Sequence, residues 1–252
     1  MTRKSVLIAG ESWTVHSIHQ KGFDSFTTTE YAEGVQWLRQ ALEDGGWQVS
    51  YQPAHVAATD FPSTVEELNA YDCVIISDVG ANTFLLHPET FTKSVPRPDR
   101  LAVLRDWVRG GGGVIMVGGY LTFQGIDAKA RYAGSAIEDA LPVTMHPYDD
   151  RAERPAGVTP AVRLPEHPAI RGVTGTWPDL LGYNVVRPRP EADVVVTVDA
   201  DPLVVAWDHG RGRGLAFTSD CGPHWAPPTF VDWDGYAPLW QQMVSWTAGE
   251  GR

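Results

Sequence analysis

Cys73-Val74-Ile75-Ile76-Ser77 is a short run of mostly apolar residues, and the polar Asp78 follows it directly. Runs of this length and composition are typical of strands that are buried on both faces of a sheet. Two similar runs, Ser5–Ala9 and Val114–Val117, also end at a turn-forming residue, in each case a glycine. Segments with helical spacing separate these runs along the chain. The alternation predicts an α/β protein with a mostly parallel sheet and helices on both faces.

Helices are predicted over residues 29–44, 98–109 and 236–248, where apolar residues recur at helical spacing. In the first of these helices, Thr29 is a candidate N-cap and the Gly45-Gly46 pair is a stop signal. A shorter helix is expected from Ser63, because Glu66 follows it at the spacing of a capping box. A further strand is expected over residues 47–51.

The second half of the chain has a different character. Residues 141–218 contain many prolines and several short β-rich runs, of which 194–198, 203–208 and 215–218 are the clearest. We interpret this region as a β-rich extension together with the last strands of the main sheet. Residues 1–252 are therefore expected to form a single domain.

Composition excludes several classes of protein. The 252 residues carry a formal net charge of −11, and no basic stripe of the kind that binds nucleic acid is visible. No apolar run approaches the roughly 20 residues of a membrane helix, so no membrane association is expected. Two cysteines do not suggest a disulfide framework, which favours a reducing, cytoplasmic location.

Polar residues gather where the predicted strands end. Ligands of parallel α/β sheets bind beyond the carboxyl ends of the strands. Glu11 begins a predicted polar loop over residues 11–16, and Asp78, Tyr120 and His224 each follow another strand-like run. We expect these four side chains to open onto one edge of the sheet.

Four segments carry a family resemblance: residues 10–13 (GESW), 77–82 (SDVGAN), 118–120 (GGY) and 218–225 (TSDCGPHW). Together they resemble the bacterial family described as "putative glutamine amidotransferase", which belongs to the class I glutamine amidotransferase-like superfamily near the trehalose-utilisation-type proteins. The resemblance implies a flavodoxin-like sheet with a tight strand–turn–helix elbow. In true glutaminases the elbow carries a nucleophilic cysteine, and a histidine and a glutamate complete the triad.

The chain departs from that pattern at the elbow, because Tyr120 occupies the position of the cysteine. A phenol with a pKa near 10 is a poor acyl nucleophile at neutral pH. Thioester glutaminase chemistry is therefore doubtful at this position. Tyr120 could instead donate a hydrogen bond to an oxyanion, act as a general acid or base, or simply cap the turn.

The segment 218–225 supplies the remaining catalytic candidates. His224 falls where the superfamily places its catalytic histidine, and Asp220 could orient it. Cys221, three residues before His224, is either a nucleophile or a buried structural thiol. Cys73 lies inside an apolar run and is expected to be buried. No ligand spacing supports a metal site, although His16 and Asp78 could join Asp220 and His224 around an ion.

Substrate-binding candidates come from the same loops. Arg131 is the best single anchor for a carboxylate or phosphate, since its guanidinium fork matches those groups. The full set of expected binding residues is Glu11, Ser12, Trp13, His16, Asp78, Asn82, Gly119, Arg131 and Trp225.

Residues 149–154 form a dense cluster of three carboxylates and two guanidinium groups. This segment is expected to be a loop that either faces water, clamps a ligand, or contacts a second subunit. We favour the subunit contact or clamp, and we expect a homo-oligomer.

Two functions remain open at the level of sequence. The first is a hydrolase or transferase that acts on a small polar molecule, with no cofactor, using Tyr120 and His224 for proton transfer. The second is a binding or regulatory module that kept the fold and lost the nucleophile. Fold alone does not separate the two, because one scaffold can host both.

Overall fold

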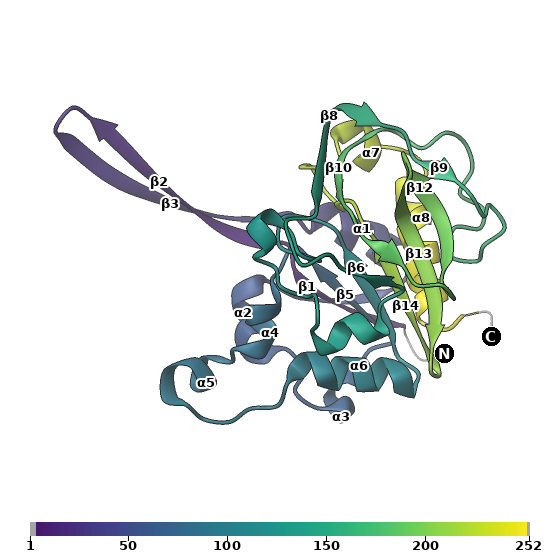
Figure 1. The fold of residues 1–252 in the computed structure, drawn as a ribbon, viewed down its shortest axis with the longest axis horizontal. Helices are drawn as coiled ribbons and strands as arrows, with labels where there is room; N and C mark the ends of the chain where they lie inside the picture. Colours follow the sequence, from purple (N-terminus) through teal and green to yellow (C-terminus); the bar gives the residue numbers. More distant parts are fainter. Residues whose placement is uncertain (1–3, 251–252) are drawn as a thin grey trace.

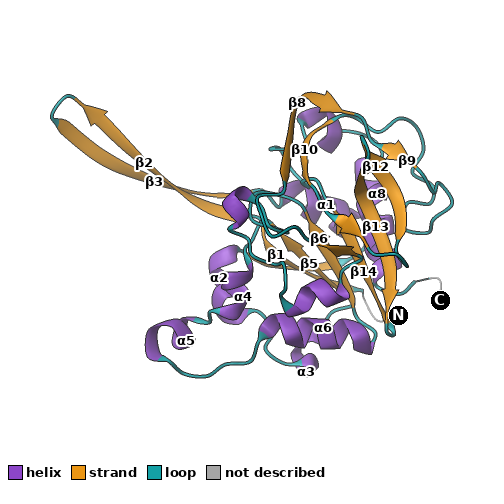
Figure 2. Cartoon of the chain, in the orientation of Figure 1, coloured by secondary structure: helices purple, strands orange, loops and turns teal. Residues whose placement is uncertain are grey.

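The computed structural model describes residues 4–250. Its centre is an eight-stranded sheet in the order β4-β1-β5-β6-β14-β13-β12-β9 (Figures 1 and 2). The first five strands of this order are mutually parallel, and the last three are antiparallel to their neighbours. The eight strands are β1 (Ser5–Gly10), β4 (Gln48–Gln52), β5 (Cys73–Ser77), β6 (Gly113–Val117), β9 (Ala161–Val162), β12 (Asp193–Val198), β13 (Asp201–His209) and β14 (Gly212–Phe217).

The parallel part has the flavodoxin-like strand order. Numbered along the chain, its strands lie in the order 2-1-3-4-5, which confirms the expected fold class. After β1 the chain adds β4 on one side of it and β5 on the other, so the strand order reverses at the switch point between β1 and β5. Ligand sites of such sheets are found at the carboxyl ends of the strands beside this point.

Helices cover both faces of the sheet because each buried strand sends alternate side chains to opposite sides. Ile8 and Ile75 pack with α1 and α8 on one face, whereas Leu7 and Val74 pack with α2, α3, α4 and α6 on the other. The helices are α1 (Gln36–Asp44), α2 (Ala54–Asp60), α3 (Val65–Leu68), α4 (Ala81–Leu85), α5 (Pro88–Lys93), α6 (Arg100–Gly110), α7 (Pro228–Val231) and α8 (Tyr236–Thr247), with short 3₁₀ turns η1 (Ile126–Ala128) and η2 (Ala136–Ala140).

The largest difference from the sequence prediction lies between β1 and α1. The expected loop over residues 11–16 and the first part of the expected helix 29–44 instead form a long hairpin, β2 (Ser12–Lys21) and β3 (Asp24–Glu33). Helix α1 begins only at Gln36. The prediction of a helix from Thr29 is wrong because the β-branched run Thr27–Thr29 favours a strand over a helix.

The second half carries the expected β-rich extension. Two further two-stranded sheets, β8 (Arg151–Val158) with β10 (Leu180–Asn184) and β7 (Val143–Thr144) with β11 (Arg187–Pro188), pack beside the main sheet. The expected loop at 149–154 is therefore mostly strand, since β8 begins at Arg151. The capping box is also present, but one residue later than expected, between Thr64 and Glu67. Among residues 4–250, no helix is both long and apolar enough to cross a membrane.

Candidate functional site

A pocket of about 360 Å³ lies at the carboxyl ends of the parallel strands. It is built from the segments that follow β1, β5, β6 and β14, which is the edge expected from the sequence. Glycines and a proline complete its wall around the charged and aromatic groups. The lining residues are Glu11, Trp13, Gly34, Asp78, Tyr120, Asp220, Gly222, Pro223 and His224.

Glu11 is the most deeply buried acid of the pocket. Its backbone takes the left-handed conformation, with φ of 47°, directly after β1. Its N–H donates to the carbonyl of Ser77 at 2.9 Å, and its carboxylate accepts a hydrogen bond from the Ser77 hydroxyl. Burial, together with the charges of Asp220 and Asp78, raises the pKa of Glu11 well above its ordinary value. Glu11 therefore holds a proton under conditions in which an exposed glutamate has lost it.

Asp78 occupies the equivalent place after β5. It also has a left-handed backbone, with φ of 42°, and its carboxylate accepts a hydrogen bond from the N–H of Leu121 at 2.8 Å. Burial and the nearby charge of Asp220 raise the pKa of Asp78 to about 6. Two adjacent strands thus end in acids with strained backbones and raised pKa values, a combination that is common at functional sites.

Asp220 and His224 form a hydrogen-bonded pair on the opposite wall. His224 Nδ1 lies 3.2 Å from a carboxylate oxygen of Asp220, whose other oxygen accepts from the N–H of Gly222 at 3.3 Å. Burial alone would lower the pKa of His224, but the hydrogen bond and charge of Asp220 outweigh it, so the pKa is raised. This arrangement fixes the ring and leaves the second ring nitrogen, Nε2, to exchange protons.

Tyr120 lines the pocket through its ring. Its hydroxyl donates to Glu153 at 3.0 Å, and the guanidinium of Arg151 lies over the ring with its carbon 4.6 Å from the centroid. Burial and the bond to Glu153 raise the pKa of Tyr120. The ring also meets His224 edge-on, with centroids 4.3 Å apart. Tyr120 is therefore held as a neutral phenol, which is a poor acyl nucleophile.

The expected strand–turn–helix elbow is not formed at this position. Residues 118–125 follow β6 as irregular turns, and only the 3₁₀ turn η1 follows them. Tyr120 thus lacks the helix N-terminus that would lower the pKa of a nucleophile and supply oxyanion donors. In place of a helix, side chains from other elements hold residues 118–125 in position.

Two buried polar side chains hold that segment in place. Asn184 accepts a hydrogen bond from the N–H of Gly119 at 3.0 Å and donates to its carbonyl at 3.2 Å. The same amide donates to Asp150 at 2.8 Å, and Asp150 also accepts from the N–H groups of Gln124 and Gly125. This network fixes the position of Tyr120 relative to the sheet.

Cys221 lies beneath the pocket and does not line it. Its side chain is fully buried, and its sulfur lies 3.8 Å from the Ser77 hydroxyl. Burial, followed by the charges of Glu11 and Asp220, raises the pKa of the thiol well above its ordinary value. A thiol kept protonated and out of solvent is a poor nucleophile.

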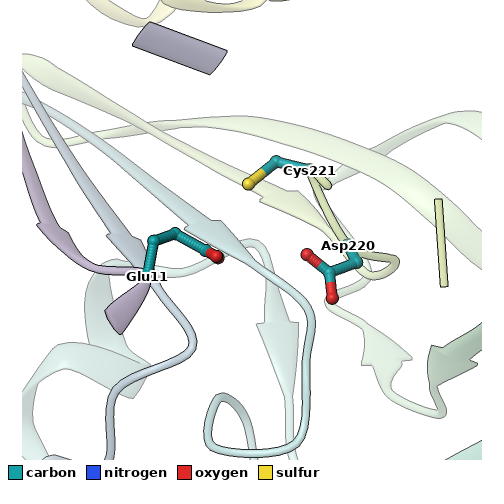
Figure 3. A group of neighbouring side chains, drawn as sticks. All are labelled: Glu11, Asp220 and Cys221. Carbon is teal, nitrogen blue, oxygen red and sulfur yellow. The ribbon is translucent and has the colours of Figure 1, made fainter. Parts of the chain in front are cut away.

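Glu11, Asp220 and Cys221 are nevertheless close together and point toward one another (Figure 3). One donor atom from each lies within 4.8 Å of the others, so these three residues could surround a metal ion. Holding the ion would require Glu11 and Cys221 to lose their protons, because thiolate and carboxylate are the ligating forms.

Several expected binding residues lie outside the pocket. Arg131 and Asn82 line a separate, open cavity of about 640 Å³ beside η1. Trp225 is buried behind Tyr120 and donates its indole N–H to Glu153 at 3.0 Å. His16 lies along the exposed hairpin and bonds to Thr29 at 3.0 Å. Ser12 and Gly119 are likewise absent from the pocket lining. The Ser12 hydroxyl accepts from the N–H of Ala54, and the N–H of Gly119 donates to Asn184.

Other residues of the site were not singled out from the sequence. Gly34 and Pro223 line the pocket, and Glu153 anchors both Tyr120 and Trp225. Gly34 had no distinguishing signal, because it lay inside a predicted helix. Glu153 belonged to the charged cluster 149–154, whose density was a signal of function without indicating its partner.

The chain belongs to the family described as "Putative glutamine amidotransferase", whose model matches residues 5–249. This agrees with the resemblance seen in the sequence motifs. Among curated proteins, no relative matches the chain.

Solved structures share the fold of this chain. Two cytoplasmic proteins from Salmonella typhimurium are 44% and 42% identical to the chain, each with a TM-score of 0.93. The match covers 96% of this chain in both cases, and 98% and 99% of the respective relatives. A ThuA-like protein from Parabacteroides merdae shares the fold with a TM-score of 0.57 at 13% identity, over 98% of this chain and 90% of its own.

Proposed function

We propose that the chain is a hydrolase or group transferase that acts on a C–N bond of a small polar molecule by acid–base chemistry, without a thioester intermediate. The observation that carries the proposal is the pairing, in one pocket, of a protonated acid with an oriented histidine. Glu11 supplies the acid, and His224 on Asp220 supplies the base. Environments that separate the roles of neighbouring titratable groups are the mark of acid–base sites.

The roles follow from the protonation states. His224 Nε2 takes a proton from water, or from an acceptor hydroxyl, as the oxygen attacks the carbon. Asp220 stabilises the imidazolium that forms. Glu11 gives its proton to the departing nitrogen. Burial disfavours the carboxylate that this leaves on Glu11. Asp78 accepts from the N–H of Leu121 and keeps the Tyr120 segment against the pocket.

The charge of the pocket indicates the chemistry of the substrate. Three of its lining residues are acids, and none is Lys or Arg. Glu11 is the protonated one, so Asp78 and Asp220 supply the negative charge. Trp13 adds an aromatic ring, and the face of such a ring attracts cations. The substrate we propose therefore carries an amino or similar basic group. Arg131, which the sequence suggested as an anion anchor, lies in the other cavity and is not part of this proposal.

The test is a panel of small amides, ureas and amidines, each supplied with and without a basic group. Release of ammonia or amine is measured for the chain and for His224→Gln. We expect turnover with basic compounds, lost in the variant. Turnover restricted to anionic compounds, or retained by His224→Gln, would contradict the proposal.

The second candidate is a binding or regulatory module, and it is favoured by the absence of an exposed nucleophile in the pocket. It predicts that the same basic molecules bind without turnover. Calorimetric titration with His224→Gln distinguishes the two, because a pure binder loses affinity and an enzyme loses rate.

As part of the proposal, we also infer a single domain over residues 1–252 and a cytoplasmic location like that of the Salmonella relatives.

A further inference from the structure

Residues 12–33 form a long hairpin that projects away from the rest of the molecule, and we refer to it as the arm (Figure 1). Its strands pair at ten positions, from Ser12 opposite Glu33 to Lys21 opposite Asp24. Within residues 4–250, neither strand meets another helix or strand at more than a few points. Contacts with the body lie at the base, where the N–H of Ala54 donates to Ser12 and Tyr31 packs on His55.

Such an arm is a poor candidate for independent stability. An isolated two-stranded hairpin is at best marginally stable in water, and it needs a further strand or a packed face. Along the arm, the side-chain contacts are internal, such as His19 stacked on Phe26 with centroids 4.5 Å apart. Its length therefore has to be stabilised by something outside this single chain.

The arm also exposes more apolar surface than a solvated hairpin requires. Ile18 is 77% exposed, and the four rings of Trp13, Phe23, Phe26 and Tyr31 are each at least two-fifths exposed. Taking about 200 Å² for a whole aromatic side chain, the four rings alone present about 500 Å². With Ile18 and Val15 added, the exposed apolar surface of one arm approaches the roughly 800 Å² per partner of a standard protein interface. This surface is divided between the two faces of the hairpin, with Trp13, Val15 and Phe26 on one face and Ile18 and Tyr31 on the other.

The edges of the arm lack the features that prevent strand pairing. Natural edge strands carry charges or proline to block the addition of another strand. Residues 12–20 and 25–29 contain no Lys, Arg, Asp, Glu or Pro. The acids of the arm lie on β3, at Asp24, Glu30 and Glu33, and so β2 has the longer uncharged edge.

We propose that the arm is a dimerisation element, and that β2 pairs antiparallel with β2 of a second copy of this chain about a two-fold axis. A second copy fits because an antiparallel pair of identical strands is self-complementary, and because a two-fold contact uses the same strand of both copies and is complete with two copies. Pairing through β2 keeps the acids of β3 on the outer edges of a four-stranded sheet. Trp13, the second residue of β2, lines the pocket, so the interface is continuous with a pocket wall.

The test compares masses by light scattering at tens of micromolar chain. In the first variant, residues 16–29 are replaced by Asn-Gly, which joins the paired positions Val15 and Glu30 by a tight turn. The second variant is Ile18→Lys. The control is Phe91→Lys, which places the same charge on a residue of α5 that is 74% exposed. Circular dichroism confirms that each variant is folded.

We expect twice the chain mass for the unmodified protein and for Phe91→Lys, and a single chain mass for the shortened arm and for Ile18→Lys. A single chain mass for the unmodified protein would overturn the proposal. It would also be overturned if the shortened variant kept the mass of the unmodified protein, because the interface would then lie elsewhere.

Discussion

Replacing Asp78 with asparagine should stabilise the protein at neutral pH. The pKa of Asp78 is raised to about 6 from 3.8, so the folded state binds a proton over a range in which the unfolded chain has lost it. Below the pKa of Asp78 in the unfolded chain, the residue is protonated in both states and does not lower the free energy of unfolding. As the pH rises to about 6, its ionisation costs up to about 3 kcal/mol at 1.36 kcal/mol for each pKa unit, and the cost then stays constant. The Asp78→Asn variant would avoid that cost, and its side-chain amide oxygen could still accept from the N–H of Leu121.

The assay is urea unfolding at several pH values between 4 and 8. We expect the variant and the unmodified protein to have similar free energies of unfolding near pH 4, and to differ by as much as about 3 kcal/mol at pH 7, as worked above. Asp234→Asn, at an exposed acid, is the control and should follow the unmodified protein. If the free energies of unfolding of Asp78→Asn and of the unmodified protein changed with pH in the same way, the reasoning would be refuted, because ionisation of the buried Asp78 would then not destabilise the folded state. Turnover should fall in the variant despite its greater stability.

Four further predictions concern the same edge of the sheet. The native protein should release no ammonia from glutamine, and iodoacetamide should modify Cys221 only after unfolding. Asn184→Ala should cost about 1–3 kcal/mol and speed hydrogen exchange in the segment around Gly119, because two buried backbone groups lose their partner. Asp220→Asn should move the rising limb of the pH–rate profile to lower pH, since the charge that raises the pKa of His224 is removed.

The sheet could be predicted because its strands carry their signal locally. Most of the parallel strands are short apolar runs followed by a turn residue, and their length and flanking residues favour a strand that is buried on both faces. The arm could not be predicted in the same way. Tyr31 happens to fall at helical spacing from Val35, although it lies in β3 and only Val35 packs against the core. Neither strand of the arm has a buried face to impose an alternating pattern.

The gathering of polar side chains at one edge could be predicted for a related reason. Glu11 and Asp78 follow β1 and β5 directly, and His224 lies in the segment after β14, so the sheet topology brings them to the same edge. Glu153 could not be assigned, because its bond to Tyr120 joins residues 33 positions apart across two sheets. The misplacement of Arg131 has the same origin, since the path of an irregular segment depends on long-range partners.

The central claim is that His224, and not Cys221, performs the chemistry of the pocket. The most direct measurement compares steady-state turnover of one basic C–N substrate from the panel by His224→Gln and by Cys221→Ala, with folding verified for both. The account predicts that His224→Gln loses at least about a hundredfold in kcat, about the least that a general base contributes, and that Cys221→Ala retains the original rate. Loss of turnover in Cys221→Ala, with retention in His224→Gln, would contradict it.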